Sequence, residues 1–349
     1  MFEFLRKLNP YSHRAYVREL LALRSKRGPY RFSVRNWQGI SDIDLAARVL
    51  NTESFRGELE PVPLPIETVK SILVLSPHQD DETIGSGGSL LLASRAGARI
   101  DVMYVTDGAQ NKVDQRDIVQ TREREARKVC SELGAKVHQL GISNLNPHPT
   151  VDDVDRLAKI IRSVKPDVVM TPWLLDLPAK HRMVNHLFWL ANQHDRAPRF
   201  EVWGYQVHNT PFVNGYVDIT SVAEQKRGLL EQYQSQIDHR RYDHMAMGLG
   251  AWNSHFLAGA PVRQYVEVFS ALPALEFFGL VESFYLANLS LTYRGDAQLI
   301  SGMTALQREM SKRAPRRGFW RMSPFARGIA KSSPVLALLL AQGLINFAF

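Results

Sequence analysis

A short apolar run that ends in a cluster of polar side chains constrains the fold of this chain most. Residues 72–75 read Ile-Leu-Val-Leu, a length and branching typical of a strand buried on both faces. His78, Asp80, Asp81 and Glu82 follow almost at once, and a glycine-rich helical stretch comes next. In α/β proteins, ligands bind at the carboxyl edge of the sheet, where strands turn into helices. The stretch therefore predicts a functional site in an α/β fold.

The following segments alternate between strand and helix patterns. Apolar runs typical of strands occupy residues 99–106, 136–140, 167–171, 202–207 and 217–220, and helical patterns occupy residues 121–133, 151–164 and 223–233. Strands that alternate with helices pair in parallel through right-handed crossovers. The sequence thus predicts a Rossmann-like, mostly parallel sheet with helices on both faces.

We expect three segments along the chain. Residues 1–68 form an N-terminal extension, with helical patterns at 14–24 and 43–50 and a stiff, proline-rich approach to the first strand. Residues 69–285 form the catalytic domain. Residues 286–349 form a tail that is rich in basic, aromatic and apolar residues.

The spacing of the polar cluster suits a metal. A catalytic divalent ion needs about three protein ligands and an open position for water. His78 and Asp81 can both face one ion from a turn, which leaves Asp80 free as a base. Imidazole mixed with carboxylate suits zinc, and also iron or manganese, better than calcium or magnesium. The alternative is that the acids only cap the next helix.

The stretches 77–82 (PHQDDE) and 85–88 (GSGG) resemble the signature of the PIG-L/LmbE-like N-deacetylases, His-Pro-Asp-Asp-Glu followed by Gly-Gly. The resemblance implies a zinc-dependent hydrolase that removes the acetyl group from N-acetylglucosamine conjugates. It implies that Asp80 is the base and that His78 and Asp81 are metal ligands, as the spacing also indicates. A glutamine replaces the family's proline, at a position without direct chemistry.

The third ligand is implied by residues 176–181, which read DLPAKH and resemble the family's Asp-x-His-Pro-Asp-His. In this comparison His181 binds the metal. Pro178 stands where the family has a histidine that acts as electrophile or acid, and Lys180 replaces the inner aspartate. The group that protonates the leaving amine must then come from elsewhere or be dispensable, and the candidates are Lys180, His208 and the base itself. The sequence leaves these three open.

Two further positions match the family and, together with Lys180 and His208, are expected to bind substrate. Asp107 lies in the Thr-Asp-Gly turn, and Arg122 begins an Arg-x-x-Glu helix motif. The resemblance implies that Arg122 reaches the substrate or a sugar phosphate. The alternative is an exposed helix arginine that pairs with Glu125 or Glu123. We interpret residues 238–256, which contain several histidines and acids, as a loop bordering the substrate cleft rather than a second metal site.

Other single residues favour structural roles. The chain has one cysteine, Cys130, which excludes an internal disulfide and suits a buried small hydrophobe. His186 lies in an apolar helical pattern and is expected to be a packed core histidine.

The net charge and composition of the chain indicate which partners it could bind. The formal net charge is +8, with basic runs at residues 1–36 and 312–331. The apolar stretch 334–349 is shorter than the ~20 residues that span a bilayer. Basic, aromatic and apolar residues together are typical of a segment at an anionic membrane surface, and the alternative is a C-terminal helix docked on the protein's own core. No nucleic-acid-binding signature is present, so we expect no nucleic-acid partner.

The start of the chain lacks the features of a secretory signal. We therefore expect a cytoplasmic protein, with contact between the tail and the inner face of the membrane as a further expectation. The expected activity is removal of acetyl from an N-acetylated sugar conjugate, such as a polysaccharide or lipid-linked glycan precursor. One alternative is a catalytically impaired metal- and sugar-binding protein of glycan assembly. Another reads GSGG as the phosphate loop of a nucleotide-dependent enzyme, although these glycines follow the acids rather than the strand.

Overall fold

The computed structural model describes residues 43–56, 61–110, 115–193, 198–238, 240–259, 261–286 and 288–313. The expected helix at 14–24 and the basic and apolar stretches beyond residue 313 lie outside this part of the chain. Among the described residues, no helix combines the length and the apolar character needed to cross a bilayer.

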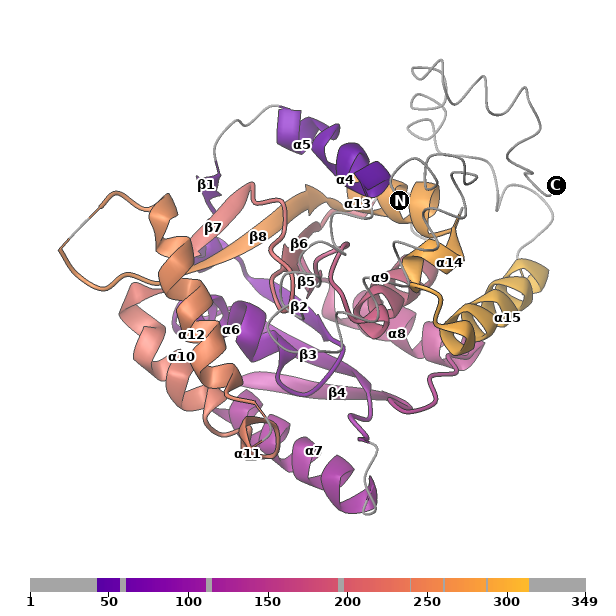
Figure 1. Cartoon of the computed structure of the whole chain (residues 1–349), viewed down its shortest axis with the longest axis horizontal. Helices are drawn as coiled ribbons and strands as arrows, with labels where there is room; N and C mark the ends of the chain where they lie inside the picture. The colour runs from indigo at the N-terminus through magenta and orange to yellow at the C-terminus, as the bar shows by residue number, and fades with distance from the viewer. Residues whose placement is uncertain are drawn as a thin grey trace, which may run out of the picture.

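A single mixed sheet lies at the centre of the described fold (Figure 1). Its strands, in spatial order, are β1 (Val62–Pro63), β7 (Gly215–Asp218), β8 (Val266–Pro273), β6 (Glu201–Tyr205), β5 (Val168–Pro172), β2 (Ser71–Ser76), β3 (Arg99–Thr106) and β4 (Ala135–Ile142). The strands from β6 to β4 pair in parallel, whereas β8 is antiparallel to both β6 and β7. The predicted Rossmann-like, mostly parallel sheet is confirmed. Strand β8 was not predicted.

Helices lie on both faces of this sheet (Figure 1). They are α4 (Ile43–Leu50), α5 (Glu53–Arg56), α6 (Asp81–Arg95), α7 (Gln115–Glu132), α8 (Val151–Val164), α9 (Ala179–Ala191), α10 (Ala223–Leu230), α11 (Gln234–Ile237), α12 (Tyr242–Asn253), α13 (Ala274–Leu280), α14 (Leu289–Thr292) and α15 (Ala297–Arg313). Short turns of other helical types lie at Ile66–Thr68, Thr220–Val222, Ser254–Phe256 and Val281–Tyr285.

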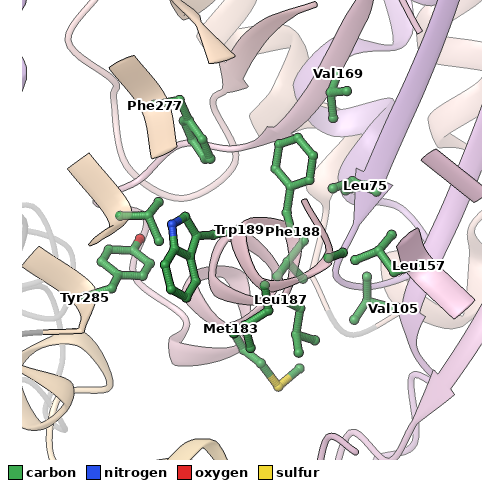
Figure 2. Close-up of a cluster of buried hydrophobic side chains, with 14 of the residues drawn as sticks. Leu75, Val105, Leu157, Val169, Met183, Leu187, Phe188, Trp189, Phe277 and Tyr285 are labelled. Atoms are coloured by element: carbon green, nitrogen blue, oxygen red, sulfur yellow. The ribbon is translucent and has the colours of Figure 1, made fainter. Parts of the chain in front are cut away.

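The middle of strand β2, residues 72–75, is apolar because it supplies both cores. Leu73 and Leu75 point into one cluster, and Ile72 and Val74 point into the other. The first cluster surrounds α9, whose side chains pack between the sheet and the segment from α13 onward (Figure 2). Successive residues of a strand face opposite sides of the sheet, so this short run needs a helix layer on each face.

The last described helix packs on the first of these cores. Leu299, Met303, Leu306 and Met310 of α15 are buried in the cluster that contains α9. They recur at the spacing of one helix face. The expected boundary at residue 285, and the three-segment division as a whole, stay predictions.

Helix α15 also contacts α9 through a polar side chain. His186 is fully buried, with Nδ1 2.7 Å from the Tyr293 hydroxyl and Nε2 3.1 Å from Nε2 of Gln307. Burial lowers the pKa of His186 to about 3, so the imidazole is neutral. His186 is therefore a packed core histidine, as predicted. Cys130 is also buried, and burial raises the pKa of its thiol to about 12, which agrees with an inert core residue.

The glycine-rich stretch lies inside α6 and serves close packing. A Cβ atom on Gly85 would overlap the ring of Tyr205, and one on Gly88 would lie 2.7 Å from Cβ of Ile219. The glycines therefore let α6 approach its neighbours closely. They do not form a loop after the strand, as a phosphate-binding loop would require.

This packing predicts the effect of a single methyl group. Gly88→Ala is expected to lower the free energy of unfolding by about 1–3 kcal/mol, because Ile219 or the helix must move. Urea denaturation measures the change. Gly228→Ala is the matched control, since a Cβ atom on Gly228 of α10 would have no neighbour within 4 Å. It is expected to be neutral or stabilising, and an equal loss in both variants would contradict the packing argument.

A buried ion pair joins α10 and β8 to the middle of α6. Nζ of Lys226 donates to Oε1 of Glu267 at 2.7 Å and to the carbonyl of Ile84 at 2.8 Å. The Glu267 carboxylate also accepts the backbone N–H groups of Gly88 and Ser89, each at 2.8 Å. In an α-helix the N–H of residue 88 would bond to the carbonyl of residue 84. The ion pair therefore bridges the two ends of that helical hydrogen bond.

Candidate metal centre and active site

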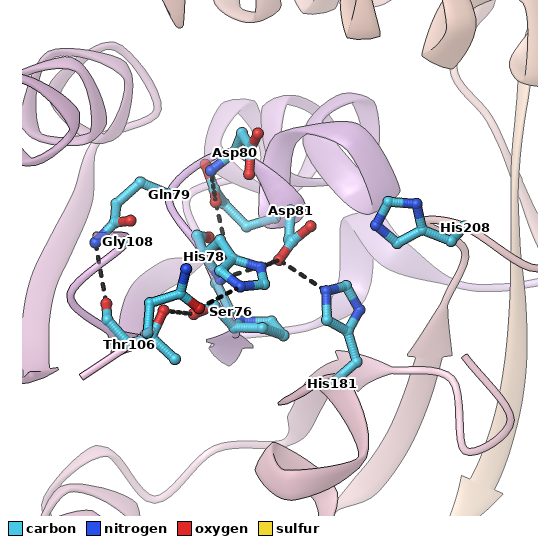
Figure 3. Close-up of polar contacts among 12 residues, drawn as sticks. Ser76, His78, Gln79, Asp80, Asp81, Thr106, Gly108, His181 and His208 are labelled. Carbon is cyan, nitrogen blue, oxygen red and sulfur yellow. Dashed lines mark hydrogen bonds and ion pairs between the residues drawn. The ribbon is translucent and has the colours of Figure 1, made fainter. Parts of the chain in front are cut away.

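Three metal-binding side chains converge at one edge of the sheet (Figure 3). His78 and Asp81 lie where β2 turns into α6, and His181 lies in the first turn of α9, beyond the end of the neighbouring strand β5. One ligand atom from each residue lies within 4.8 Å of the other two. The two imidazole centroids are 5.4 Å apart. Within the described part of the chain, no second group of this kind is found.

A buried carboxylate orients His181. Nδ1 of His181 lies 2.8 Å from Oδ2 of Asp176. The other oxygen of Asp176 accepts backbone N–H groups from Leu177 at 2.9 Å and from Asn209 at 3.0 Å. Burial acts to raise the pKa of Asp176, but its hydrogen bond and charge interaction with His181 lower it below the usual range. The imidazole is thus fixed with Nε2 directed at the site.

Nε2 of His181 has the environment of a metal ligand. It is buried without a hydrogen-bond partner, although it lies 3.3 Å from Oδ2 of Asp81. Burial acts to lower the pKa of His181, but Asp81 and Asp176 raise it to about 10. A buried nitrogen that makes no hydrogen bond and lies at ion-pair distance from a carboxylate occupies a position where a divalent cation could bind both groups.

His78 faces the same carboxylate oxygen from the other side. Its Nδ1 lies 2.9 Å from Oδ2 of Asp81, and its Nε2 lies 3.0 Å from Oδ1 of Asn144. Burial lowers the pKa of His78. Burial acts to raise the pKa of Asp81, but His181 and His78 outweigh it and hold the pKa well below the usual range. Two nitrogens and an ionised carboxylate oxygen at this separation fit a divalent transition metal.

Asp80 lies beside this group in a strained backbone conformation. Its φ and ψ are 141° and −29°, a region that residues other than glycine rarely adopt and that concentrates at functional sites. Its backbone N–H donates to Glu82 at 3.2 Å. Burial, followed by the charge of Asp81, raises the pKa of Asp80 well above its usual range. A bound cation would act in the opposite direction, because positive charge favours the carboxylate form.

Glu82 has a structural role. Its carboxylate accepts hydrogen bonds from the hydroxyls of Tyr233 at 2.5 Å, Thr83 at 2.7 Å and Ser76 at 3.1 Å. These bonds, with the one from the Asp80 N–H, fix the turn between β2 and α6.

Arg122 supports the same turn from α7. Its guanidinium donates to the carbonyls of Gln79 and Gly108, both at 3.1 Å, and lies 3.6 Å from Oδ1 of Asp80. The alternative of an exposed arginine paired with a helix acid is wrong, because Arg122 is buried. The acids have other partners: Glu123 pairs with Arg127, and Glu125 accepts hydrogen bonds from Ser235. Contact between Arg122 and substrate stays a prediction.

The other predicted substrate residues take separate positions. Oδ1 of Asp107 accepts the N–H groups of Ala109 at 2.9 Å and of Asn144 at 2.8 Å. Lys180 is half-buried at the start of α9, and its pKa is lowered by burial against opposing effects of Asp296 and Asp107. The ring of His208 lies beside the metal ligands, with its centroid 5.3 Å from that of His181 (Figure 3).

The expectation of a cleft-bordering loop at residues 238–256 is wrong for most of the stretch. Residues Tyr242–Asn253 form helix α12. Arg241 forms two hydrogen bonds to the buried Asp243 at the start of this helix, at 2.9 and 2.6 Å. Ala246 and Met247 pack in the core. The helix was not predicted because the charged residues at its start interrupt the apolar pattern of this face.

Comparisons with known proteins agree with this architecture. Residues 73–192 match the family model described as PIG-L, GlcNAc-PI de-N-acetylase. A diacetylchitobiose deacetylase of Thermococcus kodakarensis is 26% identical over 192 residues, which cover 49% of this chain and 72% of that protein.

Two solved structures share the fold. One is an N,N'-diacetylchitobiose deacetylase from Pyrococcus horikoshii, with a TM-score of 0.53, 22% identity and coverage of 66% of this chain and 93% of that one. The other is GalB, a 4-carboxy-2-hydroxymuconate hydratase from Pseudomonas putida KT2440, with a TM-score of 0.50, 21% identity and coverage of 58% and 96%. Since a deacetylase and a hydratase share this fold, activity has to be argued from the site.

Proposed function

We propose that this chain, whose residues 73–192 belong to the PIG-L family, is a metal-dependent N-deacetylase that hydrolyses the acetamide of an N-acetylated sugar conjugate. The observation that carries the proposal is the convergence of His78, Asp81 and His181 within 4.8 Å at the ends of two adjacent strands. Zinc is the proposed ion, because two imidazoles and one carboxylate are a common catalytic zinc set.

The substrate class is supported by the relatives. The family is described by removal of acetyl from a GlcNAc conjugate, and the Thermococcus relative by removal of acetyl from diacetylchitobiose. Both descriptions name an N-acetylated sugar. For this chain we propose a polysaccharide or lipid-linked glycan precursor that carries such a sugar.

The proposed roles follow from position. An ion bound by the three ligands would polarise the acetamide carbonyl and acidify a water molecule. Asp80 lies next to this group but outside it, and its carboxylate accepts the proton that the attacking water gives up. The C–N bond then breaks, and the amine nitrogen takes a proton, so that acetate and a free amine result. Asp176 and Arg122 hold His181 and the Asp80 turn in place.

Among the three groups considered for assisting the leaving amine, position favours His208. Its ring lies beside that of His181, whereas the charge interactions of Lys180 are with Asp296 and Asp107, neither of which is a proposed ligand. We propose that His208 forms a hydrogen bond to the departing nitrogen and so replaces the family histidine that is Pro178 in this chain.

The loss of that histidine also favours a second candidate function. With Pro178 and Lys180 in the motif, the chain could bind a metal and an acetylated glycan without hydrolysing it, as a protein of glycan assembly. This candidate predicts glycan binding with no acetate released.

Metal removal tests the proposal. Purified protein is expected to contain one transition-metal ion per chain by elemental analysis, and to release acetate from N-acetylglucosamine conjugates. Dialysis against a chelator is expected to lower acetate release by about 100-fold or more, because several kcal/mol of transition-state stabilisation are lost. Added zinc is expected to restore it.

Two histidine variants provide the matched comparison. His181→Ala is expected to lose the metal, whereas His255→Ala, which removes an exposed histidine of the segment after α12, is expected to retain metal and activity. Full activity in metal-free protein would contradict the proposal. Metal and glycan binding without acetate would select the second candidate.

A further inference from the structure

Asn144, in the segment after β4, is a residue that sequence reasoning did not single out. Its side-chain Nδ2 donates to the carbonyl of Ala109 at 2.8 Å, and its Oδ1 lies 3.0 Å from Nε2 of His78. A carbonyl oxygen can only accept, so the nitrogen of the amide must face Ala109. The oxygen of the amide must therefore face His78.

The position of Asn144 is itself fixed. Its backbone N–H donates to Oδ1 of Asp107 at 2.8 Å, and the same oxygen accepts the N–H of Ala109 at 2.9 Å. Asp107 thus joins the turn after β3 to the segment after β4, and both contacts of the Asn144 amide depend on it. This gives Asp107 a role that the sequence analysis did not assign.

An amide oxygen next to Nε2 determines the tautomer of His78. Nε2 must carry the proton and donate it, so in the neutral ring Nδ1 has the free lone pair. That Nδ1 lies 2.9 Å from Oδ2 of Asp81, on the side of the metal ligands. Two atoms that both offer lone pairs at this distance repel each other unless a cation lies between them.

We propose that Asn144 is a positioning residue that holds His78 in its Nε2–H tautomer and thereby presents Nδ1 to the metal. The role mirrors that of Asp176, which bonds Nδ1 of His181 and leaves Nε2 for the site. The two imidazoles thus offer different nitrogens, each selected by an acceptor on its far side. The inference rests on the proposed function only through the metal.

Two measurements on three variants test this inference. The first is the nitrogen-15 NMR spectrum of the imidazoles in zinc-loaded protein at pH 8, which distinguishes a ring that binds the metal through Nδ1 and keeps Nε2–H from one that binds through Nε2. The second is the zinc dissociation constant from competition with a chelating indicator. The variants are Asn144→Ala, which removes the acceptor, Asn144→Asp, which keeps an acceptor oxygen, and Asn146→Ala, which removes an exposed amide from the same segment.

Asn144→Ala is expected to lose the single Nε2–H tautomer of His78 and to bind zinc about 10–100-fold more weakly. Asn144→Asp is expected to retain the tautomer and to bind zinc more tightly than Asn144→Ala. Asn146→Ala is expected to match the unmodified protein in both measurements.

The outcomes separate this inference from the proposed function. If Asn144→Ala keeps the tautomer and the zinc affinity of the unmodified protein, the inference is overturned while deacetylation is untouched. A fall in melting temperature without a change in either measurement also overturns it, since it would indicate a structural role alone. If the zinc-loaded protein releases no acetate but the Asn144 variants behave as expected, the proposed function fails and the positioning role stands.

Discussion

Replacement of Glu267 by alanine is expected to lower the free energy of unfolding by about 3–5 kcal/mol. The variant would leave the ammonium group of Lys226 buried beside α6 without its counter-charge. It would also remove the acceptor of the Gly88 and Ser89 N–H groups. Urea denaturation with linear extrapolation measures the loss.

Two controls separate the buried charge from other causes. Glu224→Ala breaks an exposed ion pair with Arg227 in the same helix as Lys226, and exposed pairs contribute less than about 1 kcal/mol. The double variant Lys226→Met with Glu267→Leu removes both charges, so that no unpaired ion stays buried beside α6. It is expected to be more stable than Glu267→Ala. Equal losses in Glu224→Ala and Glu267→Ala would refute the account.

Asp80→Asn is expected to lower acetate release by about 10²–10⁴-fold, the usual contribution of a positioned general base. Asparagine has nearly the same shape as aspartate but cannot accept the proton of the attacking water. Metal content is expected to stay at one ion per chain, because Asp80 lies outside the group formed by His78, Asp81 and His181. Steady-state assays and elemental analysis check the two statements.

Stability provides the control for this variant. Burial and the adjacent Asp81 raise the pKa of Asp80, which means that the ionised carboxylate is unfavourable in the folded protein. A neutral side chain is therefore expected not to lower the melting temperature of metal-free protein. A variant that retains normal turnover would exclude Asp80 as the base, and one that loses the metal would identify Asp80 as a ligand instead.

The sequence predicted the framework of the site because that framework depends on local patterns. An apolar run predicts a buried strand, and parallel strands bring their carboxyl ends to one edge, so His78 and His181 could be expected to meet. Strand β8 was missed because the helix before it, α12, was interpreted as a loop and because the strand joins the sheet in antiparallel orientation. The burial of Glu267 was therefore not predicted. An acid in that strand is explained only by its ion pair with Lys226 of α10, which depends on the tertiary structure.

The supporting residues were harder to predict for a related reason. Asn144 is an ordinary amide in an irregular segment, and its role depends on the tertiary arrangement that brings it to His78. Arg122 was recognised by its motif, but the sequence did not indicate that its guanidinium would bond two backbone carbonyls behind the site. Motifs identify residues that take part in the chemistry more readily than residues that hold them.

Helix α9 holds His181 in its first turn and, further along, places His186 against Tyr293 and Gln307. An expression fragment chosen from the family match alone would stop at residue 192 and would lack β6, β7 and β8. A fragment ending at residue 285 would complete the sheet but would leave one side of α9 uncovered by α15. We therefore expect the smallest fragment that retains a rigid histidine at position 181 to extend at least to residue 313.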